Sequence, residues 1–572
     1  MSGLFATLNT SKTGMFAQQQ FINTTSHNIS NANTPGFSRQ HVVLQTARPQ
    51  TIAGGIGQIG TGVSMVSIER TRNQFLDYQI RKEGSHLGIY GVRQEYLSQV
   101  EGIFNEPSDT GISELMSQFF DAWQTLSKNP DKSDARTVVA QKAKALMDEI
   151  NHTYKKLDDT KNNAIQEIQS SLFDINTTLD QLNSVNKEII TVTIAGNNPN
   201  DLLDRRDALL DELSTKFGID TKSQSLNGVT CKPEGNDLIN FIKNKDSEPV
   251  NKLGYVSQIK ETATAGEYEV SYYKNGDTTS EKNKVTQTIK LSPEQHKALS
   301  EGRVIITNED GSIAGTNTGN LDAAGNPIIT INSKHIFNPP SGELGGLQSV
   351  SKDVDGYIDQ VNTLAKSIAF AVNAVHAEGI DPKVPFFVDS TTIGKTGLTF
   401  EQQFENVTAA NITINPDLLK DVMKIQTGAN SGSGSTDGDR ALAIAGLRDY
   451  ALNIAKIQGG GDYNYTKFVA EHFDVKPNGV PTSKPIASGT KIESFFKNTI
   501  NKLGVQSQEA SRIVKNQGSL LKGLLERRLS TSGVSLDEEA INLVQFQHAF
   551  QANAKVISTV DQLLDVVIGL VR

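Results

Sequence analysis

Apolar residues recur at alternating steps of four and three through the last 38 residues of the chain, positions 535–572. A period of 3.5 residues is typical of a coiled-coil seam, so this stretch predicts one helix that packs lengthwise on another. Ser535 and Glu538 form a capping box at its start, and Gly533 breaks the chain two residues earlier. Nine of the eleven seam positions are apolar, and the whole set is Leu536, Ala540, Leu543, Gln547, Phe550, Ala554, Ile557, Asp561, Leu564, Ile568 and Val571.

The first 33 residues carry a weaker copy of the same pattern. An isolated helix of this kind gains too little from burial to offset the entropy of ordering its backbone, so each chain end needs a partner. The simplest arrangement packs the two ends on each other and on copies of themselves. The N-terminal seam comprises Leu4, Leu8, Ser11, Met15, Gln18, Ile22, Thr25 and Ile29, and Phe5, Phe16 and Phe21 widen it.

Turn formers end the N-terminal helix within residues 28–37, where Pro35 and Gly36 suit a type II turn. Alternating and β-branched patches in residues 39–70 then predict a few short strands. Helix follows from Thr71, and residues 131–195 contain neither glycine nor proline. This span predicts a single helix of about 100 Å, too long for a compact domain. Two antiparallel helices are the alternative.

Residues 201–213 predict a helix that runs back along the preceding one. Its charged residues 204–207 could suggest an acid-base cluster, but consecutive side chains on a helix point in different directions, so a solvated charged face is favoured. Strand-like pieces alternate with Asn, Asp and Gly turns in residues 219–342, which predicts a β-rich insert. Helix returns over residues 348–377. A last long helix covers residues 491–529, with breaks or loosening expected at Gly504, Gly518 and Gly523.

Candidate chemistry is sparse. Residues 55–60 match the pattern GxGxxG, yet strand-like residues follow where a dinucleotide site requires a helix, so a glycine-rich β-turn is favoured. Asp437 and Asp439 could bind a hard cation, but EF-hand spacing is missing, and a flexible polar loop over residues 427–439 is favoured. Cys231 is the only cysteine, which excludes an intrachain disulfide and a cysteine-ligated metal site.

The 572-residue chain has a formal net charge of −9 and no basic stripe, so nucleic acid is not an expected partner. No apolar run approaches the length of a membrane span, and the N-terminus does not have the pattern of a cleaved signal peptide. These features alone indicate a cytoplasmic protein, a prediction that the following resemblance changes to extracellular.

Three segments resemble the axial proteins of the bacterial flagellum: SGLF at residues 2–5, NISNANTPGFSR at 28–39 and FQHAFQANAKVI at 546–557. Residues 201–213 and 342–347 narrow the resemblance to hook-associated members of that family, and residues 411–416 and 438–444 are similar to them too. The resemblance covers roughly residues 1–220, 340–380 and 405–572.

The resemblance and the patterns together imply a multidomain, elongated α+β fold. Residues 1–35 with 535–572 would form a terminal coiled-coil domain. A long-helix domain with some strands would comprise residues 36–220, 341–380 and 405–534. Residues 221–340 would be the inserted β-rich outer domain, and residues 381–404 a small insertion or loop.

The resemblance implies a structural adaptor that joins hook to filament, with no reaction and no cofactor or metal. Expected partners are copies of itself in a ring, the hook protein, the next hook-associated junction protein and a cytoplasmic export chaperone on the C-terminal helix. Export would use the flagellum-specific type III apparatus without a cleaved signal peptide, for which a disulfide would be an obstacle. The expected assembly interface is Leu4, Leu8, Met15, Ile22, Ile29, Leu536, Leu543, Phe550, Ile557, Leu564 and Ile568.

Three alternatives stand beside this hypothesis. The first is a sibling axial protein of hook or rod type. The second is a dinucleotide-binding enzyme, which rests on residues 55–60 alone. The third is a membrane-surface coiled coil, which the acidic polar face of residues 535–572 disfavours because interfacial helices usually carry a Lys/Arg-rich face.

Overall fold

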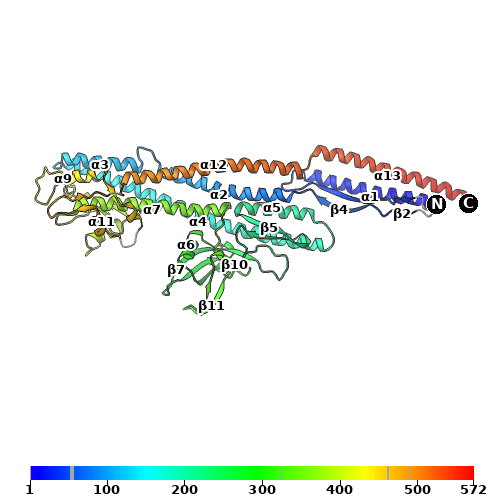
Figure 1. Cartoon of the computed structure of the whole chain (residues 1–572), viewed down its shortest axis with the longest axis horizontal. Coiled ribbons are helices and arrows are strands. Elements are labelled where there is room, and N and C mark those ends of the chain that lie inside the picture. Colours follow the sequence, from blue (N-terminus) through cyan, green and yellow to red (C-terminus); the bar gives the residue numbers. More distant parts are fainter. Residues whose placement is uncertain (1, 52–56, 323, 460–462, 487, 572) are drawn as a thin grey trace. The chain divides into compact units, whose positions relative to one another are not determined.

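The computed structural model describes residues 2–51, 57–322, 324–459, 463–486 and 488–571 (Figure 1). The chain divides into two compact units. Unit 1 comprises Met1–Ile89, Gln169–Gly345 and Lys515–Arg572, and unit 2 comprises Tyr90–Ile168 and Gly346–Val514. The helices with residues in both units are α2 (Gln74–Phe104), α4 (Ser133–Ile194), α7 (Gly342–Ala377) and α12 (Ile492–Ser532).

The two chain ends form a helical pair in unit 1. Helix α1 spans Ser2–Asn31 and helix α13 spans Leu536–Val571, and they lie side by side as the blue and red helices of Figure 1. The ring of Phe21 stacks on that of Phe546, with a centroid distance of 4.5 Å. The predicted terminal helices and their pairing are therefore confirmed.

The seam between these helices has a slightly different register from the prediction. None of the predicted positions of α1 is exposed, but Phe5 and Phe16 are 55% and 57% exposed and do not widen the seam. On α13 the buried Glu539 and the stacked Phe546 belong to the face toward α1, whereas the expected neighbours Ala540 and Gln547 are exposed. That face continues through Leu543, Phe550, Asn553, Ile557, Val560, Leu564 and Val567, while Asp561 and Ile568 are exposed.

A β-hairpin packs beside α1. Strands β1 (Gln40–Thr46) and β4 (Val63–Arg70) pair antiparallel, with a bulge at Val43/Leu44, and the short strands β2 (Gln50–Thr51) and β3 (Gln58–Ile59) pair beyond them. The preceding turn is type II as predicted, because Gly36 has φ +82° and the Phe37 amide donates to the Thr34 carbonyl at 3.2 Å.

Two long helices test the effect of glycine. Helix α4 confirms the single uninterrupted helix predicted for residues 131–195. Helix α12 also runs without a break, so the breaks expected at its glycines were wrong. A glycine costs a helix only about 1 kcal/mol relative to alanine, and tertiary packing outweighs that. In unit 1 this packing joins Leu521, Leu524 and Leu525 of α12 to Leu76 and Ile80 of α2.

The inserted β domain is confirmed as a six-stranded sheet in unit 1, with strand order β10-β7-β8-β9-β12-β11. All neighbours pair antiparallel except β9 and β12, which are parallel. Its core includes Val256, Tyr272 and Ile289. The domain boundaries given above stay a prediction. The strands are β7 (Asn251–Glu261), β8 (Glu267–Tyr273), β9 (Lys284–Lys290), β10 (Val304–Asn308), β11 (Thr316–Leu321) and β12 (Pro327–Thr330).

Two elements of the insert region were not expected in detail. Helix α6 (Pro293–Gly302) follows a complete capping box made by Ser292 and Gln295. A separate hairpin pairs β5 (Ile219–Ser223) with β6 (Val229–Pro233).

Unit 2 combines its helices with several two-stranded sheets around an aromatic core that includes Trp123, Phe119 and Phe386. Across the described helices, none combines the length and apolar character that a membrane span needs. The remaining helices of unit 2 are α3 (Ile112–Lys128), α8 (Pro416–Lys420), α9 (Asp439–Gly446), α10 (Ile454–Gln458) and α11 (Tyr465–His472). The strand pairs of unit 2 are β13 (Phe387–Asp389) with β14 (Ile412–Ile414), β15 (Ala451–Leu452) with β18 (Thr490–Lys491), and β16 (Phe473–Asp474) with β17 (Thr482–Ser483).

Candidate functional site

The terminal helices meet the rest of unit 1 at a polar joint centred on residues 38–40. Ser38 donates to Asp204 of α5 (Asn200–Lys216) twice, from its amide at 2.8 Å and from Oγ at 2.7 Å. The amide of Arg39 donates to the carbonyl of Ser532, at the end of α12, at 2.8 Å. Gln40 exchanges two hydrogen bonds with Asn28 of α1 through its backbone, at 3.0 and 2.9 Å. One short segment thus connects α1, α5 and α12.

Glu539 adds α13 to this joint. Its carboxylate accepts from Arg39 Nε at 2.7 Å and from Asn28 Nδ2 at 3.1 Å, and the residue is only 2% exposed. The neighbouring Glu538 also approaches Arg39, at 3.5 Å, but its side chain is 66% exposed. A carboxylate this deeply buried is tolerated only when it is paired and hydrogen-bonded. The first turn of α13 is therefore fixed by polar contacts to the N-terminal segment.

Beneath the joint, α5 carries a buried ion-pair network. Arg70 of β4 contacts Asp204 at 2.6 Å and Asp207 at 2.7 Å. Arg81 of α2 contacts Asp207 at 3.2 Å and Asp211 at 2.7 Å, and Arg528 of α12 contacts Asp211 at 2.5 Å. The network therefore links four elements of unit 1.

The prediction that the charged run of α5 is solvated was wrong. Asp204, Arg206 and Asp207 are buried, and Arg205 alone of the run is exposed. The spacing could have indicated this, because steps of three and four place Asp204, Asp207 and Asp211 on one helix face. What the sequence did not show is that arginines from β4, α2 and α12 face them.

Electrostatics keeps this network charged. Burial by itself raises the pKa of the Asp207 carboxyl, but the charges of Arg70 and Arg81 outweigh burial and hold that pKa below its usual range. Burial by itself lowers the pKa of the Arg81 guanidinium, and Asp211 and Asp207 more than reverse this, so its pKa is raised. Burial lowers the pKa of Arg206 to about 10, and its Nη1 donates to the Asn227 carbonyl at 2.5 Å. Carboxylates already paired in this way position helices and are not poised to exchange protons.

The expected interface residues lie on the two terminal helices, and Ile29 and Leu536 are close in the chain to the joint residues Asn28 and Glu539. Leu536 and Ile568 are 50% and 57% exposed. Their role between copies of the chain stays a prediction. The others are half-buried, and they are Leu4, Leu8, Met15, Ile22, Ile29, Leu543, Phe550, Ile557 and Leu564. The sequence analysis did not predict the contacts that Asn28, Arg39 and Glu539 make in the joint. The available signal was Glu539 itself, a charged residue four positions before the seam residue Leu543 and therefore on the same helix face.

Large apolar side chains remain exposed on the terminal helices and on the hairpin strands beside α1. Their number on these few elements makes the terminal helices and the hairpin the candidate contact surface. These residues are Phe5, Phe16, Ile59, Met65, Val66, Leu536, Ile541, Val544, Val556, Leu563, Val566 and Ile568.

Among the residues that the structure describes, the other candidates show no reactive arrangement. Residues 55 and 56 of the GxGxxG match lie outside the described residues, and strand β4, not a helix, comes next after Gly60. In the loop 427–439, Asp437 accepts from the amides of Ala429 at 2.7 Å and Asp439 at 3.0 Å, so its oxygens are engaged within the loop. Within the described ranges no group of His, Cys, Asp and Glu could hold a metal ion.

Cys231 lies on β6 and is fully buried. Burial raises the pKa of its thiol to about 12, so almost none of the nucleophilic thiolate forms at neutral pH.

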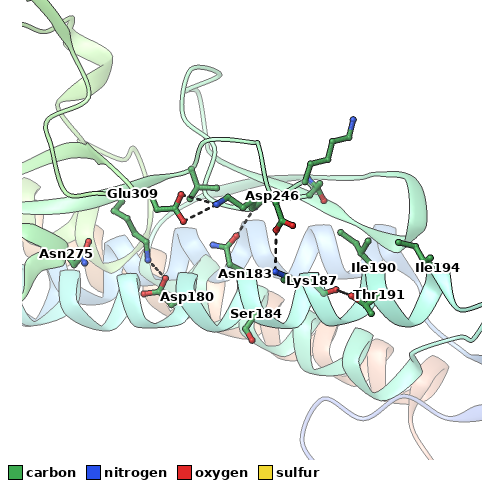
Figure 2. A pocket seen from close by; sticks show the side chains of 15 residues that line it. Asp180, Asn183, Ser184, Lys187, Ile190, Thr191, Ile194, Asp246, Asn275 and Glu309 are labelled. Atoms are coloured by element: carbon green, nitrogen blue, oxygen red, sulfur yellow. Dashed lines mark hydrogen bonds and ion pairs between the residues drawn. The ribbon is translucent and has the colours of Figure 1, made fainter.

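A groove of about 590 Å³ in unit 1 lies between α4 and the start of the β domain (Figure 2). Lys187 pairs with Asp246 at 3.4 Å, Lys243 with Glu309 at 3.0 Å, and Lys252 with Asp180. The first and last of these pairs connect the helix to the insert, so they tie the β domain to α4.

Comparison with known proteins adds the identity of these parts. A family model described as "Flagella basal body rod protein" matches residues 8–37, and one described as "Flagellar basal body rod FlgEFG protein C-terminal" matches residues 526–570. Asn28 and Glu539 of the joint fall within these two stretches. Both ends of the chain thus define a flagellar axial protein, a structural component of the bacterial flagellum.

A third family model, "Flagellar hook-associated protein FlgK helical domain", matches residues 97–387. Flagellar hook-associated protein 1 of Bacillus subtilis (strain 168) is 30% identical over 584 residues, covering 100% of this chain and 99% of that protein. The proteins of the same name from Salmonella typhimurium and Escherichia coli (strain K12) are 25% and 24% identical, each covering 98% of this chain and 99% of that protein. The chain belongs to the flagellar hook-associated protein 1 family.

One solved structure, of the flagellar hook junction protein FlgK from Burkholderia pseudomallei, is 13% identical with a TM-score of 0.46 and covers 80% of this chain and 100% of that chain. Because the full-length relatives are hook-associated proteins, the hook- or rod-type alternative is not favoured. The chain is an extracellular flagellar component that serves motility.

Proposed function

We propose that this chain is the adaptor that joins hook to filament, assembled as a ring of copies, and that it catalyses no reaction. The observation that carries the proposal is the paired α1 and α13, which still expose Leu563, Val566 and Ile568. A helix that is apolar on several sides is stable only when neighbours cover it. Copies of the chain supply those neighbours within the ring, and the hook protein and the next hook-associated junction protein supply them on its two sides.

The same exposed residues bear on export. Before assembly, apolar positions of α13 such as Val566 would face water, so an export chaperone that covers the C-terminal helix is part of the proposal. The chain leaves the cell through the flagellum-specific type III apparatus with no cleaved signal peptide. Cys231 has no second cysteine with which to form a disulfide that would obstruct threading.

Electron microscopy of cells that lack this protein tests the junction role. We expect hooks without filaments, and filaments restored by the wild-type chain. Filaments that persist in the deletion strain would contradict the role.

A surface variant tests the interface. Ile568→Asp should fail to restore filaments, because it places a charge on the exposed apolar face of α13. The matched control is Ile194→Asp, since Ile194 is 67% exposed but lies at the end of α4. Equal effects of the two variants would remove the terminal helices from the interface.

A further inference from the structure

At the joint, the placement of α13 depends on residues of the N-terminal segment. The proposed assembly does not by itself require this dependence. Glu539 is the first buried residue of α13, and both groups that bind its carboxylate, Arg39 and Asn28, belong to the N-terminal segment. Arg39 and Gln40 are in turn held from outside α13. The amide of Arg39 is bound by Ser532, the backbone of Gln40 by Asn28, and Gln40 Nε2 donates to Asp201 at 2.7 Å.

The N-terminal segment has its own anchor on α5. Ser38 makes two hydrogen bonds to Asp204, and Gly36 lies beside α5, where an added Cβ would be in ordinary van der Waals contact with the Ala208 side chain at 3.4 Å. Arg72 donates to the Gly36 carbonyl at 3.3 Å and to Ser38 Oγ at 3.2 Å. None of these contacts involves α13, so the turn can seat on α5 before α13 arrives.

The reverse order is unfavourable. If α13 packed along α1 while residues 38–40 were still unplaced, Glu539 would be buried without Arg39, and an unpaired buried carboxylate is strongly destabilising. We propose that Glu539 is the positioning residue that couples the two chain ends, so that α13 closes only onto an N-terminal turn already seated on α5. This coupling rests on the proposed function, because it concerns how the terminal helices become ordered during assembly.

The test uses the full chain in flagella purified from a deletion strain that expresses each variant. Glu539→Gln keeps the shape of the side chain and removes its charge. Glu538→Gln is the matched control, because Glu538 also faces Arg39 but is largely exposed. Hydrogen exchange is measured over residues 28–40 and 536–546. In Glu539→Gln both segments should exchange about tenfold faster than in Glu538→Gln, since a buried charged hydrogen bond is lost.

A double variant separates coupling from simple damage. Arg39→Gln combined with Glu539→Gln removes both charges and should restore at least part of the protection, since no charge is then left unpaired. If Glu539→Gln does not assemble at all, restored filaments in the double variant support the coupling, and their continued absence overturns it.

Exchange in Glu539→Gln equal to that in Glu538→Gln also overturns the coupling. Failure of the proposed function is recognised separately. In that case filaments persist in the deletion strain itself, whichever way Glu539→Gln behaves.

Discussion

Phe21 and Phe546 stack with their ring centroids 4.5 Å apart, although they lie near opposite ends of the chain. Because the contact joins α1 to α13, neither terminal helix has its full packing surface without the other. The terminal pair can therefore form only when both ends of one molecule are present and ordered.

Replacing Phe546 with alanine should loosen this pair. Loss of a half-buried stacked ring costs about 2 kcal/mol, equivalent to roughly thirtyfold faster hydrogen exchange of the α1 amides in purified flagella. Phe173→Ala is the control, because Phe173 is 46% exposed on α4. Unchanged exchange of α1 in Phe546→Ala would show that the stacking contributes little.

Substitution within the buried network should destabilise unit 1. Asp204→Asn removes the charge opposite Arg70 and should cost about 3 kcal/mol, measured as a lower urea midpoint by circular dichroism. Trp123 lies in unit 2, so its fluorescence transition should move less. The comparison variant is Asp201→Asn, with a side chain 65% exposed, for which a cost below about 1 kcal/mol is expected. Similar costs for the two variants would count against a buried network.

Acid should destabilise unit 2 through His376. Burial lowers the pKa of this imidazole to about 3, and its Nε2 accepts from the Gln426 amide at 3.0 Å. The unfolded chain binds a proton near pH 6.5 and the folded chain does not, so stability is lost as the pH falls below about 6.5. At pH 5 the loss should be about 2 kcal/mol.

Urea titrations at pH 7 and pH 5, followed by Trp123 fluorescence, measure this loss. His376→Gln should reduce the difference in the free energy of unfolding between the two pH values by about 2 kcal/mol. The difference that remains includes the contribution of His472, whose pKa burial also lowers. His548→Gln, at an exposed position of α13, should leave it unchanged. An undiminished difference in His376→Gln would assign the acid sensitivity to other groups.

The terminal helices should be poorly ordered in the isolated monomer. Burial of one seam offsets only part of the entropy of fixing two long helices, and their outer apolar residues have no cover before assembly. In dilute solution, NMR of a chain labelled at isoleucine should therefore give sharp, random-coil methyl signals from Ile22, Ile29, Ile541 and Ile557. Rigid, protected signals from these residues in a monomer would contradict the prediction.

Long-range periodicity predicted most helices well. The absence of glycine and proline over residues 131–195 was enough to predict α4, and the 3.5-residue pattern predicted α1 and α13. The pattern could not set the register of α13 to within one residue. Either Ala540 or Glu539 could face α1 at this turn of the helix. Glu539 does so, because Arg39 and Asn28 bind its carboxylate.

Burial of charge was the hardest feature to predict. The run of α5 looks solvated when its helix is considered alone, and Asp204 becomes buried only because Arg70 and Ser38 arrive from distant parts of the chain. Likewise, the glycines of α12 weaken an isolated helix, whereas Leu524 packs against Leu76 and Ile80 and keeps the helix intact. Both outcomes depend on tertiary partners that a local pattern does not contain.

The buried position of Cys231 has a practical consequence. Its thiol is inaccessible, and a pKa raised to about 12 leaves almost no thiolate at neutral pH. Maleimide dyes should therefore not react with the native chain, and they should label only a cysteine introduced at an exposed site, such as Leu238→Cys. The wild-type sequence is already the unreactive background that fluorescence labelling of this protein on living cells requires.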